Sequence, residues 1–352
     1  MKRLARHALS GEMVELEAPD GAGARVDELY ISPGFIDLQV NGFAGVDFNS
    51  PEVSLEELSR AIDSIRSTGV RRFFPTVITG PREAMTAALR NLYRAQQELP
   101  NGRAIAGFHV EGPHISPEEG PRGAHPIGSV CAPDFREFQN WQEATAGQVR
   151  IVTLSAHWPQ APSYIEKVVA AGSLVSIGHT HATSLQIADA VRAGAAMSTH
   201  LGNGAHRVMP KFPNYIWDQL SHDELAASFI VDGIHVPAAF LKAALRAKTI
   251  DRSVLVTDAS APAGAEPGRY RLGEQAVDLT ADGRVVLAGQ DRLAGSALKM
   301  HDAVANAMKM AGLPLAEAVT MATMNPQRVA GLDPSVETIL FRLVDGRIEI
   351  LA

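Results

Sequence analysis

The chain has 352 residues, enough for about two average domains, or for one (β/α)₈ barrel of about 250 residues with a smaller addition. Hydrophobic residues make up 46% and charged residues 20%, which excludes a disordered or fibrous protein. The formal net charge of −7 argues against a general polyanion binder, although a few local cations can still hold a small anion.

Cysteine usage and hydropathy narrow the class of protein further. The single cysteine, Cys131, excludes intrachain disulfides and multi-cysteine zinc sites. The basic start of the chain lacks the apolar core of a signal peptide, and no run approaches the length of a membrane span. We therefore expect a cytoplasmic protein that binds neither nucleic acid nor membranes. With 12 histidines and one cysteine, any transition-metal site must use histidine and carboxylate ligands.

Short hydrophobic runs alternate with amphipathic stretches along the middle of the chain. Eight runs have the near-continuous hydrophobicity of strands buried on both faces of a parallel sheet. They are Phe35–Val40, Arg72–Ile78, Ala104–Val110, Val149–Ser155, Ser173–Gly178, Ala195–Thr199, Leu225–Val231 and Ser253–Thr257. The predicted helices between them are Ser54–Thr68, Pro81–Glu98, Ser163–Ala171, Ser184–Ala193 and Pro237–Ala247. This alternation predicts a (β/α)₈ barrel, with a doubly wound open sheet as the structural alternative.

The two ends of the chain do not follow this alternation. Residues 1–33 and 326–352 contain short β-like segments, and Asp345–Gly346 is a strong hairpin-turn signal between two of them. We expect these ends to form one small, discontinuous β domain beside a barrel of residues 34–325. Glycine-punctuated segments near 264–292 predict a β-hairpin insertion in the barrel domain.

Polar side chains follow the predicted strands at the edge where barrel enzymes carry their catalytic groups. Glu111 follows the third strand, His179 the fifth, His200 the sixth and Asp258 the eighth. The first three would supply one oxygen and two nitrogens to a divalent metal and leave a position for water, as in catalytic zinc sites. Asp258 would then take a proton from that water and pass it to a leaving amine.

Each of these residues also has a structural interpretation. A lone histidine at a strand end is more often a hydrogen-bonded structural residue than a ligand. Glu111 alone could accept hydrogen bonds from its loop, and Asp258 alone could cap the following turn. The coincidence on four strands favours the metal site. Structural or solvent-facing roles are expected for the other side chains of interest, namely His114, His157, His181 and the thiol of Cys131.

Nine motifs occur in the order and approximate spacing of one known family. They are SPGFIDLQVNG, GFHVEGPH, GAHP, SIGHTHA, STHLGN, VDGIHV, VTDASAPAG, GSALKM and MATMNPQRVAG. From about Ile31 to Leu332 the chain thus resembles the N-acetylglucosamine-6-phosphate deacetylases of the amidohydrolase superfamily. The resemblance implies a metal-bearing (β/α)₈ TIM-type barrel, a small β-sandwich domain from the termini, a homodimer, and hydrolysis of N-acetylglucosamine 6-phosphate to glucosamine 6-phosphate and acetate.

The resemblance also implies roles for individual residues. Glu111, His179 and His200 would be the metal ligands, Asp258 the general base and acid, and His125 a catalytic residue near the acetamide. Substrate contacts are expected from Ala124, Asn203, Gly204, Asp232, His235, Leu293, Ala294 and Gly295.

Two departures from the family pattern bear on metal and substrate. Where many superfamily members have His-x-His, this chain has Gln39 and Asn41, whose neutral amides are poor ligands. We therefore expect one divalent ion per subunit, with Zn²⁺ first and Fe²⁺, Co²⁺ or Mn²⁺ as alternatives. The family's phosphate-binding arginine is replaced by Lys211, which lacks the planar bidentate fork, and Arg207 lies nearby in the sequence.

Three alternatives to this function remain. The same chemistry could act on another N-acyl amino sugar, unphosphorylated or of galactosamine type, or on N-acyl amino acids. Cyclic imide hydrolysis is a second amidohydrolase reaction, but it relies on a two-metal site that usually begins with His-x-His. The third is an inactive barrel that serves as an interaction protein, and the joint presence of four candidate site residues argues against it.

Overall fold

Eight parallel strands form the centre of the computed structural model, which describes residues 2–17 and 29–352. In space they follow the order of the sequence: β4 (Phe35–Val40), β7 (Val70–Ile78), β8 (Phe108–Glu111), β9 (Val149–Leu154), β10 (Leu174–Ile177), β11 (Met197–Ser198), β12 (Ala226–Phe229) and β13 (Ser253–Leu255). Each overlaps one of the eight runs predicted from hydrophobicity, although the predicted run Ala104–Val110 begins four residues before β8, at a residue that lies in a short 3₁₀ helix.

The sheet closes on itself beyond the last strand. Val40 at the end of β4 forms a parallel bridge with Ala259, which follows β13. The Asn41 N–H donates to the Ala259 carbonyl at 2.6 Å, and the Asp258 N–H donates to the Gln39 carbonyl at 3.0 Å. These bonds join the two edges of the sheet. The predicted (β/α)₈ barrel is therefore confirmed, and the open doubly wound sheet was the wrong alternative.

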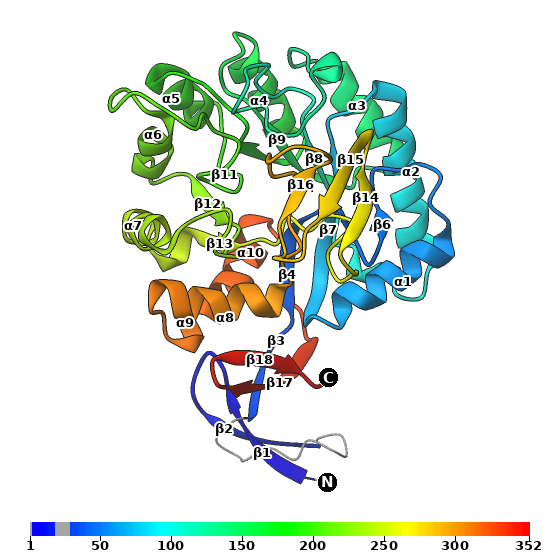
Figure 1. Cartoon of the computed structure of the whole chain (residues 1–352), viewed down its shortest axis with the longest axis vertical. Coiled ribbons are helices and arrows are strands. Elements are labelled where there is room, and N and C mark those ends of the chain that lie inside the picture. Colours follow the sequence, from blue (N-terminus) through cyan, green and yellow to red (C-terminus); the bar gives the residue numbers. More distant parts are fainter. Residues whose placement is uncertain (1, 18–28) are drawn as a thin grey trace.

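Helices surround the barrel (Figure 1). The α-helices are α1 (Leu55–Arg66), α2 (Arg82–Glu98), α3 (Phe135–Ala144), α4 (Ala161–Ala170), α5 (Ser184–Arg192), α6 (Tyr215–Ser221), α7 (Ala238–Lys248), α8 (Met300–Ala311), α9 (Leu315–Ala322) and α10 (Met324–Val329). Short 3₁₀ helices are η2 (Gly102–Ala104), η3 (Ile127–Ser129) and η4 (Ile250–Arg252). At α1 the side chains of Ser54 and Glu57 form a reciprocal capping box.

The two ends of the chain meet in one five-stranded sheet below the barrel (Figure 1). Its order is β18 (Arg347–Ile350), β17 (Thr338–Val344), β3 (Leu29–Pro33), β1 (Lys2–His7) and β2 (Met13–Glu17). The β17–β18 hairpin turns at Asp345 and Gly346, both with positive φ, as the sequence predicted. Residues 1 and 18–28 of the predicted small domain lie outside the described residues, and its boundaries stay a prediction.

The side chains of this small sheet join the core of the barrel. Phe341 and Ile348 are buried in the same hydrophobic cluster as the barrel strands and helices. Tyr30 stacks on Phe341, with ring centroids 5.6 Å apart. This ring contact lies within the sheet, between β3 and β17. The burial of Phe341 and Ile348 in the shared cluster is what joins the sheet to the barrel, at the end remote from the strand ends that carry the polar residues.

Residues 268–287 form a second small sheet beside the barrel mouth. Its antiparallel strands are β14 (Gly268–Leu272), β15 (Gln275–Leu279) and β16 (Val285–Leu287), within the predicted hairpin insertion. Their apolar side chains pack on Ile78 and Ala294, at the rim of the barrel. A two-stranded ribbon, β5 (Gly42–Phe43) and β6 (Val46–Asp47), follows β4.

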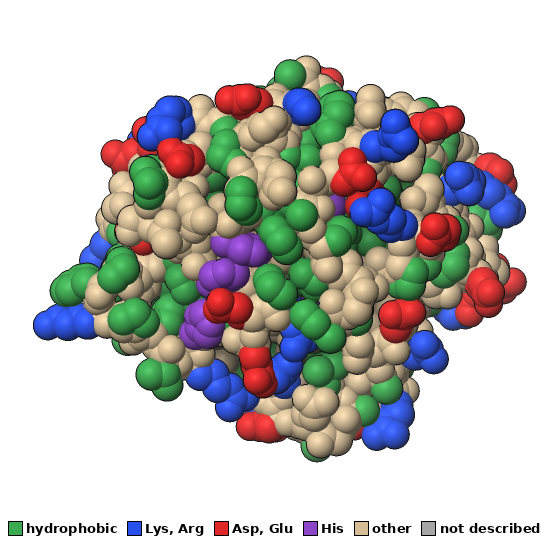
Figure 2. All heavy atoms as spheres, turned by 90° about the horizontal axis from the view of Figure 1, so that it is seen from above, with side chains coloured by type: hydrophobic (Ala, Val, Ile, Leu, Met, Phe, Trp, Pro, Cys, Tyr) green, Lys and Arg blue, Asp and Glu red, His purple; other side chains and the backbone are tan. Residues whose placement is uncertain are grey.

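The surface carries acidic and basic side chains interspersed over the face shown in Figure 2. That mixture differs from the single-sign stripe of a polyanion-binding surface. Among the helices in the described residues, none combines the length and hydropathy that crossing a membrane requires.

Candidate active site

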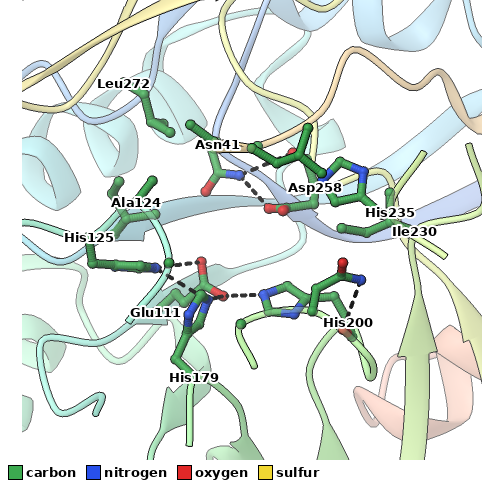
Figure 3. A pocket seen from close by; sticks show the side chains of 17 residues that line it. Asn41, Glu111, Ala124, His125, His179, His200, Ile230, His235, Asp258 and Leu272 are labelled. Atoms are coloured by element: carbon green, nitrogen blue, oxygen red, sulfur yellow. Dashed lines mark hydrogen bonds and ion pairs between the residues drawn. The ribbon is translucent and has the colours of Figure 1, made fainter. Parts of the chain in front are cut away.

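The predicted polar residues lie together at the carboxyl ends of the barrel strands (Figure 3). Glu111 ends β8, His179 and His200 follow β10 and β11, and Asp258 follows β13. Three of them have left-handed φ values: 48° for His179, 30° for His200 and 50° for Asp258. Non-glycine residues adopt such angles at an energetic cost, which is often paid at functional sites.

Two histidine nitrogens converge on one carboxylate oxygen. Glu111 Oε1 lies 2.9 Å from His200 Nε2 and 3.2 Å from His179 Nε2. All three side chains are at least nine-tenths buried. Burial acts to raise the pKa of Glu111, but hydrogen bonds and charge interactions with the two histidines outweigh it and hold that pKa well below its usual value. The carboxylate is thus ionised.

The hydrogen-bond pattern around the histidines fits a bound cation. His179 Nδ1 lies 2.8 Å from the Pro121 carbonyl, which only accepts, so Nδ1 carries a proton. Nε2 is therefore the nitrogen that would hold a cation beside the Glu111 carboxylate, in place of its hydrogen bond to Glu111. One carboxylate oxygen and two imidazole nitrogens are a donor set for Zn²⁺ and related divalent ions.

Two amide side chains from β4 and its extension connect the carboxylates. Gln39 Nε2 donates to Glu111 Oε1 and to Asp258 Oδ1, both at 3.0 Å. Asn41 Nδ2 donates to Asp258 Oδ1 at 2.7 Å. Burial, followed by repulsion from Glu111, raises the pKa of Asp258 to about 6 in spite of these bonds. Asp258 can therefore exchange a proton near neutral pH.

Two further histidines border the cavity, each with one nitrogen fixed. His125 Nδ1 lies 2.8 Å from Thr79 Oγ1, and His125 Nε2 lies 3.3 Å from His179 Nε2. Burial lowers the pKa of His125 to about 3, so this ring is neutral. His235 Nδ1 lies 2.6 Å from Asp232 Oδ2, which leaves its Nε2 available. Asp232 thus orients His235 and does not itself border the cavity.

The other predicted substrate contacts fall into two groups. Those that border the cavity are Ala124, Asn203, Gly204, Leu293, Ala294 and Gly295. Arg207 instead lines an adjoining groove. The groove shares four residues with the cavity, namely Gly123, Asn203, Gly204 and Leu293. Lys211 borders neither; its Nζ lies 5.8 Å from the ring centroid of the exposed Phe212.

Some residues of the site were not predicted as contacts. Asn41, Ile78, Gly123, Ile230 and Leu272 border the cavity as well. Asn41 carried a signal, because it follows the first barrel strand as a polar residue. The apolar residues carry none, since an exposed cavity wall and a buried core select the same side chains.

Comparison with known proteins identifies the family of this chain. Residues 30–340 match the amidohydrolase family. The chain is 35% identical over 300 residues to an N-acetylgalactosamine-6-phosphate deacetylase from Shewanella sp. (strain ANA-3), covering 83% of this chain and 72% of that protein. It is 34% identical over 321 residues to an N-acetylglucosamine-6-phosphate deacetylase from Bos taurus, covering 88% and 77%.

A solved structure is similar throughout its length. It is a mutant N-acetyl-D-glucosamine-6-phosphate deacetylase from Mycobacterium smegmatis in complex with N-acetyl-D-glucosamine-6-phosphate. The TM-score is 0.86 and the identity 28%, with 99% of this chain and 96% of that chain covered. The likeness includes both the barrel and the terminal sheet.

Replacement of Glu111 tests the metal-binding geometry. Because an amide is a much poorer ligand than a carboxylate, Glu111→Gln should lose one equivalent of divalent metal per chain relative to the wild type. Elemental analysis after exhaustive dialysis measures this. The matched control is Glu118→Gln, at an exposed carboxylate. An unchanged metal content in Glu111→Gln would remove Glu111 from the ligand set.

Proposed function

The chain belongs to the amidohydrolase family, and we propose that it is a metal-dependent deacetylase that removes acetate from an N-acetylated amino-sugar 6-phosphate. The first substrate candidate is N-acetylglucosamine 6-phosphate, with glucosamine 6-phosphate as product. The observation that carries the proposal is one cavity in which the Glu111–His179–His200 group faces Asp258, with two oriented histidines beside it.

Glu111, His179 and His200 would hold one divalent ion, with Zn²⁺ as the expected metal. When bound there, such an ion polarises a carbonyl and lowers the pKa of water. Gln39 and Asn41 occupy the place where many relatives of the superfamily have His-x-His, and their amide groups donate to Asp258. These donations favour a single ion in the cavity.

Asp258 is the proton carrier in this proposal. As a carboxylate it accepts the proton of the water that attacks the acetamide carbon. As a carboxylic acid it returns that proton to the nitrogen as the C–N bond breaks, so that acetate and a free amine leave. Asn41 and Gln39 both donate to Oδ1, which leaves Oδ2 to exchange the proton.

Polar side chains place the acetamide and the sugar. His125 has Nδ1 fixed on Thr79, so its Nε2 side faces the cavity beside His179 and positions the acetamide. His235, held by Asp232, and Asn203 and Gly204 supply polar contacts to the sugar and its phosphate. The apolar residues from Leu293 to Gly295 close the cavity on the side of the small insertion sheet.

Arg207 is the arginine that we assign to the phosphate. It lines the groove that opens from the cavity, and within the described part of the chain it has no acidic partner. The two other arginines of that groove are already paired, Arg284 with Asp291 and Arg292 with Glu119. Because Lys211 borders neither the cavity nor the groove of its own chain, it would reach the phosphate only in a second subunit. We therefore also propose a homodimer. A cytoplasmic location is proposed as well.

The Asp258→Asn variant tests the proton carrier. Because an amide cannot accept the proton, turnover should fall by about 10²–10⁴-fold while metal content stays unchanged. Near-normal turnover in Asp258→Asn would remove Asp258 from the mechanism. Asp223→Asn, at an exposed carboxylate, is the control.

The pH dependence of the wild type is a separate test of Asp258. The rate of turnover should fall as pH drops below about 6, since the acid form of Asp258 cannot act as a base.

A substrate panel separates the alternatives left by the sequence. The 6-phosphates of N-acetylglucosamine and N-acetylgalactosamine should be compared with both free sugars and with an N-acetyl amino acid. We expect kcat/KM to be higher for the phosphorylated sugars than for the free sugars. The Arg207→Ala variant should raise KM for the phosphorylated sugars and leave KM for the free sugars unchanged. Equal turnover of free and phosphorylated sugars would contradict the assignment of the phosphate, and turnover of the amino acid alone would replace the substrate class.

A further inference from the structure

A second group of potential metal ligands lies outside the cavity. His114, Cys131 and Glu137 each place a ligand atom within 4.8 Å of the others. His114 lies three residues beyond the end of β8, Cys131 follows η3, and Glu137 is in the first turn of α3. None of the three borders the cavity that contains Glu111.

Unpartnered polar atoms are concentrated at this place. Eleven buried side-chain nitrogen and oxygen atoms in the described residues have no hydrogen-bond partner. Five of the eleven belong to four side chains in or beside this group: His114 Nε2, Glu137 Oε1 and Oε2, Trp141 Nε1 and Tyr164 Oη. The His114 ring lies 5.9 Å from the Trp141 ring and 5.2 Å from the Tyr164 ring, between centroids.

These orphaned atoms point to a missing occupant. Buried polar groups are nearly always hydrogen-bonded, and a cluster of exceptions indicates a bound water or ion. His114 is fully buried and Glu137 is 3% exposed, so bulk water does not satisfy them. His114 Nε2 lies 3.8 Å from Glu137 Oε2, and Cys131 Sγ lies 3.7 Å from His114 Nδ1. The nitrogen–oxygen separation is wider than a hydrogen bond allows, whereas the sulfur–nitrogen separation is that of a weak hydrogen bond. His114 Nδ1 also lies 3.4 Å from the Cys131 carbonyl, so His114 Nε2 and both Glu137 oxygens are the atoms of the three residues that lack a hydrogen-bond partner.

We propose that His114, Cys131 and Glu137 bind a divalent transition-metal ion, with Zn²⁺ the best match to the donor set. A thiolate, an imidazole nitrogen and a carboxylate oxygen are three of the ligands that Zn²⁺ prefers, and water completes a tetrahedral set. Cys131 is partly exposed, which gives an ion and its water a route to the group. On binding, the Cys131 thiol loses its proton to solvent as the sulfur–metal bond forms.

Arg82 is the cation near this group in the structure. Its guanidinium lies 3.6 Å from Glu137 Oε2 and 4.0 Å from Cys131 Sγ. The Arg82 side chain is 55% exposed and also lies 3.6 Å from the exposed carboxylate of Asp134, so it can turn toward solvent and Asp134 when an ion takes its place beside Glu137. Arg82 therefore balances the charge of Glu137 in the metal-free protein and gives way when an ion binds.

The position of the site gives the ion a structural role. His114 and Cys131 lie near the two ends of the loop that carries His125 and Ala124 into the cavity. The ion would join both ends of this loop to α3 through Glu137. It would thereby fix the loop against the barrel without contact with the substrate.

Cobalt substitution of the full-length chain tests the proposal, because the chain has one cysteine. Only Cys131 can produce a thiolate-to-Co²⁺ charge-transfer band in the near ultraviolet. We expect this band in the wild type and in Glu111→Gln, which lacks the cavity ion. We expect its loss in Cys131→Ser and its weakening in Glu137→Gln. Glu143→Gln, an exposed carboxylate on the same helix, is the control and should keep the band.

Zinc content gives the second readout. Cys131→Ser should hold one equivalent less than the wild type, with circular dichroism as the check of folding. Where the variants fail to fold, Zn²⁺ should still slow alkylation of Cys131 in the wild type. Absence of the cobalt band, or equal alkylation rates with and without Zn²⁺, would overturn the proposal and leave a hydrogen-bonded cluster that holds water only.

Discussion

The Gln39 amide, held between two buried carboxylates, is the interaction on which the site depends. Glu111 is 3% and Asp258 8% exposed, and their negative charges repel at close range in a medium of low dielectric constant. Gln39 Nε2 donates to both. Gln39 and Asp258 are also joined through the backbone where the barrel closes. The pair of carboxylates therefore exists only in the closed barrel, since Gln39 and Asp258 come from opposite ends of the barrel sequence.

A polar layer beneath the cavity holds these groups in place. Asp37 accepts the Thr257 hydroxyl hydrogen bond and the Gln39 N–H, and burial raises its pKa to about 7. His109 bridges the Leu38 carbonyl and the Thr153 hydroxyl across the barrel interior. A satisfied network of this kind limits the rotamers of the residues above it. The left-handed backbone at His179, His200 and Asp258 then turns their side chains toward one another.

Much of the barrel and of the candidate site could be predicted from local sequence. Parallel strands buried on both faces need continuous apolar runs, so β4 and β10 lie where such runs predicted strands. Glu111 and Asp258 could be predicted as site residues because each directly follows a predicted strand. Features that depend on distant contacts could not be predicted. The double hydrogen bond of Gln39 needs the closed barrel. The position of Lys211 outside the cavity depends on how its loop folds. Helices α3, α6, α9 and α10 were not among the predicted helices. In α6 and α10, seven and six residues are too few to show a clear period.

In the proposed site, Gln39 and Asn41 keep Asp258 free of metal, so that Asp258 carries the proton while one ion occupies the cavity. Anomalous X-ray diffraction from zinc-loaded crystals of the wild type tests it most directly. We expect one peak in the cavity, within bonding distance of Glu111, His179 and His200, with Asp258 still hydrogen-bonded to both amides. A peak bonded to Asp258, or a second peak between Asp258 and Glu111, would contradict it.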